Sequence, residues 1–159
     1  MKIFIAFVIL LFLTSSCDLS TEQETQLNKD LSNLISVRNN GDALSYLNYT
    51  HPIIVKHYKL LGDSVYKNRF QSISPKSSRD YLDTNEIYWT NAYQKDVKST
   101  DSLIQVKVQI TLARGYDKID SSSTIYGIAK KKGSNWLFVE KRDYFSDYFP
   151  ENLRLFNDD

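Results

Sequence analysis

The spacing of apolar residues changes from a helical period to a strand period about halfway along the chain. In the first half, an apolar stripe at i, i+4, i+7 and i+8 comprises Leu27, Leu31, Leu34 and Ile35. In the second half, alternate residues from Ile104 to Leu112 are apolar and the residues between them are polar, which is typical of a half-buried strand. Helices followed by consecutive strands predict an α+β fold.

Turn and cap signals divide the first half into four predicted helices. A Ser or Thr followed three residues later by Gln or Glu is typical of a capping box, and Asn39-Asn40-Gly41 should end the first helix. Proline suits the first turn of a helix. The expected caps or first residues of the four helices are Ser20 or Thr21, Asp42, Pro52, and Asp63 or Ser64.

The second half predicts a curved antiparallel sheet of about four strands, with one packed face and one solvent-facing face. The polar stretches 74–80, 96–102 and 114–123 are typical of loops. The tail beyond residue 143 is too apolar to be free, so we expect it to pack as an extension or a short helix. The expected strands are 86–94, 102–113, 124–131 and 136–141.

The first seventeen residues form a separate unit. One lysine precedes the apolar run Ile3–Leu13, whose eleven residues suit a signal peptide (about 7–15) but not a bilayer-spanning helix (about 20). Two serines then lead to Cys17, the only cysteine. This is the layout of a bacterial lipoprotein signal, in which the cysteine thiol accepts a diacylglyceryl group before cleavage, although Thr14 stands where such signals usually have leucine.

The signal predicts both the domain organisation and the location. Residues 1–16 would be the cleaved signal peptide, 17–24 a lipid-anchored tether and 25–159 a single domain. Cys17 would carry palmitate-type chains that hold the protein on a membrane of the cell envelope, facing the periplasm or the exterior. Two alternatives remain open: ordinary secretion, with Cys17 an accidental neighbour of the cleavage site, and an uncleaved anchor.

The composition argues against several classes of function. Without residues 1–16 the chain has 143 residues, with 19 Lys and Arg against 19 Asp and Glu, so no net charge attracts nucleic acid or anionic lipid. Lipidation of Cys17 would leave no thiol for a disulfide. His51 and His57 are too few for a site of Cys and His ligands. We therefore expect no metal, no cofactor and no nucleic-acid partner.

Three short motifs occur in order along the chain. They are the corner Tyr49-Thr50-His51-Pro52, the hairpin Gly133-Ser134-Asn135-Trp136-Leu137-Phe138 and the ending Tyr148-Phe149-Pro150-Glu151-Asn152-Leu153. Over roughly residues 24–156 the chain resembles the nuclear transport factor 2-like superfamily, and most of all its exported bacterial members. The resemblance implies a cystatin-like α+β cone, in which helices are wrapped by a bent antiparallel sheet.

The resemblance also implies where a catalytic group would lie. Isomerases and dehydratases of this superfamily place an Asp or His with Tyr partners inside the cone. The apolar face of 104–112 carries no ionisable residue, and Glu140 shares the parity of Trp136 but stands at a strand end near solvent. The candidate catalytic group is therefore His51, which would act as a base with Tyr49 or Tyr93 as its partner. The alternative role for His51 is a helix cap.

Our leading hypothesis is a non-enzymatic lipoprotein whose domain binds a small apolar ligand or an envelope protein. The alternative is an isomerase- or dehydratase-like enzyme using His51 with Tyr49 or Tyr93. A third class is a structural module, such as a subunit of an envelope complex. The predicted polar sheet face weighs against an apolar obligate dimer through that surface; it comprises Gln105, Lys107, Gln109 and Thr111.

Overall fold

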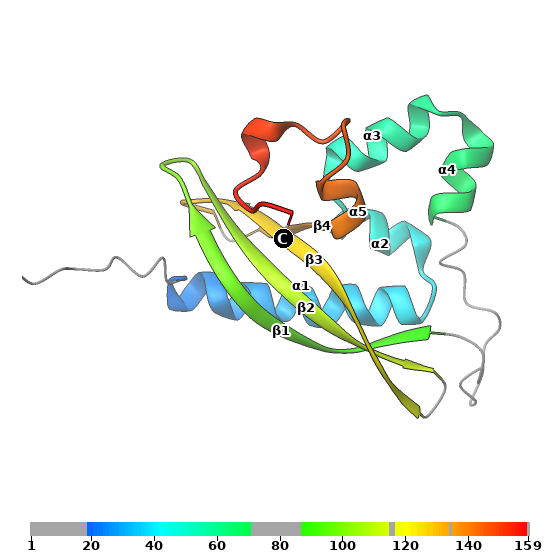
Figure 1. Cartoon of the computed structure of the whole chain (residues 1–159), viewed down its shortest axis with the longest axis horizontal. Coiled ribbons are helices and arrows are strands. Elements are labelled where there is room, and N and C mark those ends of the chain that lie inside the picture. Colours follow the sequence, from blue (N-terminus) through cyan, green and yellow to red (C-terminus); the bar gives the residue numbers. More distant parts are fainter. Residues whose placement is uncertain (1–18, 71–86, 115–116, 134, 159) are drawn as a thin grey trace, which may run out of the picture.

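The computed structural model describes residues 19–70, 87–114, 117–133 and 135–158, which form an α+β domain (Figure 1). The elements are α1 (Thr21–Asn39), α2 (Ala43–Tyr49), α3 (Pro52–Leu60), α4 (Asp63–Phe70), β1 (Ile87–Ser99), β2 (Leu103–Arg114), β3 (Asp117–Lys130), β4 (Leu137–Glu140), α5 (Lys141–Tyr144) and the 3-10 turn η1 (Glu151–Leu153). The prediction of helices followed by a four-stranded antiparallel sheet is confirmed. The predicted signal, Cys17 and the predicted loop 74–80 lie outside the described residues.

The helices begin and end where the local sequence predicts. At the start of α1, the Ser20 hydroxyl accepts from the Gln23 backbone amide at 3.2 Å, and the Gln23 side chain accepts from the Ser20 amide at 3.1 Å. The Asp42 side chain caps α2, and Pro52 opens α3. Gly41 follows α1 with a φ of 65°, a conformation that favours glycine. Because α1 begins at Thr21, it includes the last four residues of the segment predicted as a tether.

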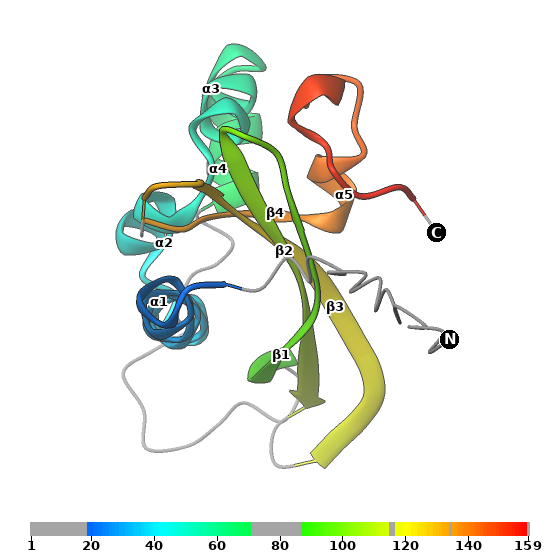
Figure 2. The ribbon, with the colours of Figure 1, turned by 90° about the vertical axis from the view of Figure 1, so that its left-hand side faces the viewer.

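The sheet has the order β1-β2-β3-β4, with every neighbouring pair antiparallel. Helix α1 lies along one face and buries its predicted apolar stripe there, with Leu27, Leu31 and Leu34 in the core. The C-terminal segment that begins with α5 lies on the other side of the sheet (Figures 1 and 2). The strands bend along their length, and register shifts interrupt the β1–β2 and β2–β3 pairings.

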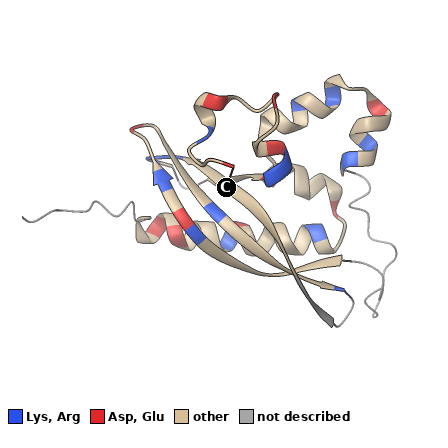
Figure 3. Ribbon diagram, viewed as in Figure 1, with Lys and Arg blue, Asp and Glu red and all other residues tan. Residues whose placement is uncertain are grey.

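The start of α1 is fixed to the turn between β3 and β4. The Gln23 side-chain amide donates to the Lys131 carbonyl at 2.9 Å, and the Trp136 indole donates to the Gln23 carbonyl at 3.1 Å. Glu22 and Lys132 line a shared hollow at this end. Charges of both signs therefore meet here, as they do along α1, whereas α3 carries lysines and no acidic residue (Figure 3). This end of the domain has no surface of a single sign.

Two strands are longer than predicted. β1 continues to Ser99 and β3 begins at Asp117, so most of the stretches 96–102 and 114–123 is paired strand, not loop. The physical reason is that β2 offers backbone groups along both edges, and these groups need partners. Polar residues in the neighbouring strands can supply them while their side chains reach solvent.

The predicted solvent-facing side of the sheet is covered over part of its area, which corrects the expectation of one wet face. Gln105 is fully buried, and its side-chain amide donates to the Leu153 carbonyl. Its side-chain oxygen accepts from the Tyr144 hydroxyl at 2.6 Å and from the Leu155 amide at 3.2 Å. Tyr126 on the same face stacks on Tyr144 with ring centroids 3.9 Å apart. The prediction that the apolar tail packs on the domain is confirmed.

Gln105→Leu should lower the free energy of unfolding by about 1–3 kcal/mol, because the Leu153 carbonyl loses its side-chain donor and the buried Tyr144 hydroxyl loses its acceptor. Urea unfolding followed by the fluorescence of the buried Trp136 measures this. The control is Gln109→Leu on the same strand and face, where the side chain is only half-buried and donates to the Ser122 hydroxyl. The control should change stability by about 0.5 kcal/mol at most. Equal losses in both variants would contradict the assignment.

Candidate functional site

A cluster of charged and tyrosine side chains lies between the helices and the β4–α5 junction. We call it the Arg69 cluster; it comprises Arg69, Glu140, Asp143, Tyr46, Tyr58 and Tyr148. One guanidinium nitrogen, Nη2 of Arg69, lies 3.0 Å from Oε1 of Glu140 and 2.9 Å from Oδ2 of Asp143. A single cation therefore bridges two carboxylates that are three residues apart in the chain.

Three tyrosine hydroxyls also donate to these carboxylates. Tyr46 donates to Oε1 of Glu140 at 3.0 Å, and Tyr58 donates to Oδ1 of Asp143 at 3.1 Å. Tyr148 donates to the same oxygen of Asp143. The side chain of Asp143 is 1% exposed, so these protein groups replace nearly all of its contact with water.

The surroundings shift the pKa values of Asp143, Arg69, Tyr46 and Tyr148 away from neutral pH. Burial acts to raise the pKa of Asp143, but hydrogen bonds from Tyr148 and Arg69 outweigh it, and the pKa is lowered. Burial acts to lower the pKa of Arg69, but the carboxylates of Glu140 and Asp143 outweigh it, and the pKa is raised. Burial, with nearby carboxylates, raises the pKa values of Tyr46 and Tyr148. The tyrosines therefore stay protonated donors around charged carboxylates.

This arrangement suits structural cohesion better than acid–base chemistry. A general base needs access to a substrate proton and a pKa near the working pH. Asp143 has neither, because it is buried and its pKa is lowered. The space beside the cluster, bounded by Leu34, Trp89 and Phe138 among others, is about 10 Å³. That is room for one water molecule at most, so this part of the described interior does not accommodate a substrate.

His51 caps α3, as the alternative interpretation predicts. Its ring nitrogen Nδ1 accepts from the Ile53 amide at 3.4 Å, and its backbone amide donates to the Phe138 carbonyl at 3.0 Å. The ring packs edge-on against Phe149, with centroids 5.5 Å apart. Burial lowers the pKa of His51. The imidazole thus caps α3 and packs on the C-terminal segment, while the backbone of His51 joins α3 to β4.

The two tyrosines proposed as partners of His51 occupy different places. Tyr49 ends α2 and packs half-buried against the core. Tyr93 is 52% exposed on β1, opposite Gln109 and on the sheet face away from α1. His51 bonds to β4, at the far edge of the sheet from β1, and three strand spacings amount to roughly 14 Å. The structure does not bring Tyr93 to His51.

Sequence reasoning missed the Arg69 cluster. Glu140 was expected near solvent, yet its carboxylate lies in the cluster, and Asp143 and Arg69 were not candidates at all. One signal was present. Glu140 shares the parity of Trp136 and Phe138, both of which are buried, so its inward direction could be predicted. No local pattern links it to Arg69, about seventy residues earlier.

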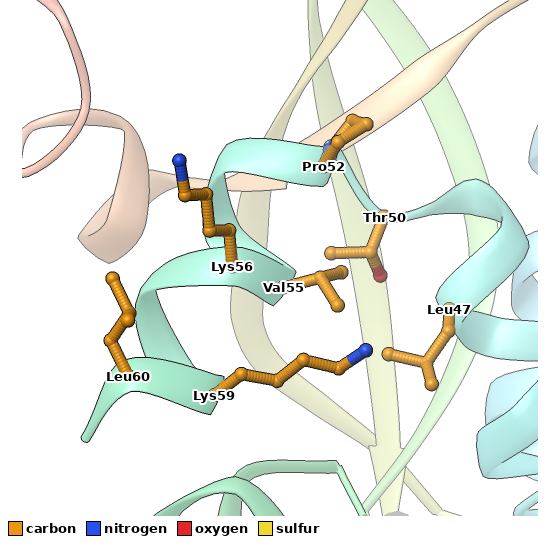
Figure 4. A pocket seen from close by; sticks show the side chains of 7 residues that line it. All are labelled: Leu47, Thr50, Pro52, Val55, Lys56, Lys59 and Leu60. Carbon is orange, nitrogen blue, oxygen red and sulfur yellow. The ribbon is translucent and has the colours of Figure 1, made fainter. Parts of the chain in front are cut away.

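The second candidate site is an open groove between α2 and α3, of about 510 Å³ (Figure 4). Its lining is Leu47, Thr50, Pro52, Val55, Lys56, Lys59 and Leu60. Within α2, Tyr46 is buried, Leu47 packs half-buried against the core and Leu44 is 80% exposed. Leu60, on the groove wall, is 77% exposed.

The groove is basic as well as apolar. Lys56 and Lys59 line it, and the Lys59 side chain extends across it toward Leu47 (Figure 4). The sequence has no Asp or Glu between residues 43 and 62. In the part of the chain that the structure describes, neither lysine forms an ion pair with a carboxylate. The ammonium of Lys59 lies 5.7 Å from the centre of the Tyr66 ring. The groove can therefore accept an acidic, apolar binding partner.

Comparisons of this chain with protein-family models, curated proteins and solved structures find no match. Among the described helices, none combines the length and the apolar composition needed to cross a membrane. Within the same residues, no three or more His, Cys, Asp and Glu side chains are placed to hold a metal ion.

Asp143→Asn should reduce the free energy of unfolding by about 3–5 kcal/mol at pH 7, because it breaks a buried ion pair from one side. The folded-state pKa of Asp143 is lowered from an unfolded value of about 3.9. The free energy of unfolding that the wild type has in excess of Asp143→Asn is therefore complete above about pH 4. It is lost as the pH falls through the lowered pKa of Asp143 in the folded state. Urea unfolding at several pH values measures the difference between the two proteins.

The control for this pH dependence is Asp147→Asn, which changes an exposed carboxylate four residues later. It should leave the free energy of unfolding within about 0.5 kcal/mol of the wild type at every pH. If the loss caused by Asp143→Asn were the same at pH 2 as at pH 7, the assignment of a charged, paired Asp143 would be wrong.

Proposed function

We propose that this chain is a bacterial cell-envelope lipoprotein, anchored through acylated Cys17, whose domain binds a partner protein at its outer surface. The signal-like pattern of residues 1–17 supports the anchor. Four helices followed by a bent four-stranded sheet agree with the nuclear transport factor 2-like architecture suggested by the motifs, and we propose that architecture as well. The domain acts as a binding module, not as an enzyme.

The observation that carries partner binding is the contrast between the space beside the Arg69 cluster and the groove on the surface, both formed by described residues. The space at the Arg69 cluster is about 10 Å³, whereas the groove between α2 and α3 is about 510 Å³. Small-ligand sites bury most of the ligand within a concave pocket. The groove is lined by α2, α3 and their connection, and it is open on its remaining side, where the wall residue Leu60 is exposed. It therefore favours a partner protein that covers this open side.

The position of the anchor supports the same function. Ser20, which caps α1, follows Cys17 by three residues, and such a segment spans about 10 Å at most. The domain therefore lies close to the membrane at the start of α1. The 19 residues of α1 extend about 28 Å from there, and α2 follows at the far end. The groove is thus formed by helices that follow α1, and none of its lining residues adjoins the attachment point.

Cys17→Ser in the full-length chain should abolish labelling with a palmitate analogue and release the protein from the membrane fraction. The reason is that the thiol is the acceptor of the lipid, and multiple acyl chains give stable anchoring. Metabolic labelling and fractionation measure both effects. Ser15→Ala, which keeps a small residue before the cysteine, is the control and should remain labelled. Labelled Cys17→Ser, or an unlabelled wild type, would overturn the anchor.

Native mass spectrometry separates a partner-binding domain from a small-ligand carrier. The mature protein, purified from its host membrane in detergent, should show the mass of the acylated chain and no further retained small molecule. The physical reason is that the space beside the Arg69 cluster holds one water molecule at most and that the groove between α2 and α3 is open and cannot enclose a small ligand. A reproducible additional mass that survives on the folded protein would contradict this prediction and favour a small-molecule carrier or an enzyme.

A further inference from the structure

The two helices that form the groove expose leucines on it and beside it. Leu44 precedes Leu47 by one helical turn and so shares its side of α2. Leu60 lines the groove at the end of α3, and Leu61 follows it; both are exposed. Scattered exposed leucines are ordinary, but a continuous apolar patch marks an interaction site.

The two lysines of the groove give this surface a positive charge and a defined distance between the charges. Lys56 and Lys59 are three residues apart on α3, which places their Cβ atoms about 5–6 Å from each other on one side of the helix. Carboxylates three or four residues apart on another helix have the same spacing. Because residues 43–62 carry no Asp or Glu, no acidic group of this stretch competes for the lysines.

We propose that the groove between α2 and α3 binds an amphipathic helix of a partner protein that carries apolar side chains flanked by Asp or Glu. The inference rests on the proposed function and names the chemistry of the partner. Apolar side chains of the partner pack between Leu47, Val55 and Leu60, which is the helix-in-groove mode of recognition. Its carboxylates pair with Lys56 and Lys59, which adds specificity and speeds association.

Two other occupants fit the observations less well. A symmetric contact with a second copy would bring the same patch of both copies together, so the lysines of one would face the lysines of the other. A membrane lipid is disfavoured because none of the lining residues of the groove belongs to the start of α1, which is the end of the described domain next to the proposed anchor.

Photo-cross-linking in intact cells tests the proposal on the full-length chain. A benzophenone amino acid replaces Leu60 on the groove wall or Tyr93 on the exposed face of β1. We expect a protein adduct at Leu60, and mass spectrometry of the adduct should locate a partner segment in which Asp or Glu accompany apolar residues at helical spacing. Adducts at Leu60 that contain only phospholipid, only a second copy, or a segment without carboxylates would overturn the proposal.

Charge reversal tests the role of the lysines. Lys56→Glu with Lys59→Glu should reduce the yield of the Leu60 adduct about tenfold or more, because like charges then face each other. The matched control reverses two exposed lysines outside the groove lining, Lys29→Glu with Lys67→Glu, and should change the yield less than twofold. Replacing the two mapped partner carboxylates by lysine should restore the adduct of the groove variant. An unchanged yield, or a failed restoration with both proteins folded, would refute the charge pairing.

The same experiment separates failure of the groove from failure of the proposed function. A protein adduct at Tyr93 with none at Leu60 would overturn the groove assignment and leave a partner-binding lipoprotein. Extending the probe to Leu44 and Asp147, both exposed, samples two further surfaces. If none of the four positions gave a protein adduct while the chain fractionated with the membrane, both partner binding and the groove would be wrong.

Discussion

The arrangement of the helices around the sheet depends on the buried carboxylate of Asp143. Removing such a charge from water costs several kcal/mol, and the cost is offset only if hydrogen bonds and an opposite charge replace the solvent. The replacements come from separate elements: Arg69 from α4, Tyr58 from α3 and Tyr148 from the segment after α5. Each element must therefore reach the same point. The ion pair specifies where α3, α4 and the C-terminal segment meet, whatever its net contribution to stability.

The next residue extends this constraint to the other side of the sheet. Asp143 bonds to groups of α3 and α4, while Tyr144 donates to Gln105 of β2 and stacks on Tyr126 of β3. Two adjacent residues of α5 thus engage both sides of the domain. The Tyr144 oxygen also accepts from the Leu155 amide at 2.8 Å, which ties the end of the chain to the same point. The covered sheet face follows from the position of α5.

The sequence predicts well those features that depend on residues close to one another in the chain. The caps at Ser20 and Asp42 and the capping role of His51 depend on residues within a few positions, and all three are observed. The ends of β1 and β3 depend on pairing with β2, so local polarity underestimates them. The burial of Gln105 could not be predicted from its own strand, because the segment that covers it lies about fifty residues later in the chain. The Arg69 cluster could not be predicted for the same reason, because its members lie far apart in the sequence.

The groove is a consequence of the same interior packing. Tyr46 points inward because its hydroxyl donates to Glu140, whose carboxylate also pairs with Arg69. Residues two positions apart on a helix differ in direction by about 200°. In the seven-residue α2, burying Tyr46 therefore turns Leu44 outward. The local sequence does not reveal this direction, because the carboxylate that Tyr46 bonds to lies 94 residues later in the chain. The exposure of Leu44 beside the groove therefore depends on the buried charges.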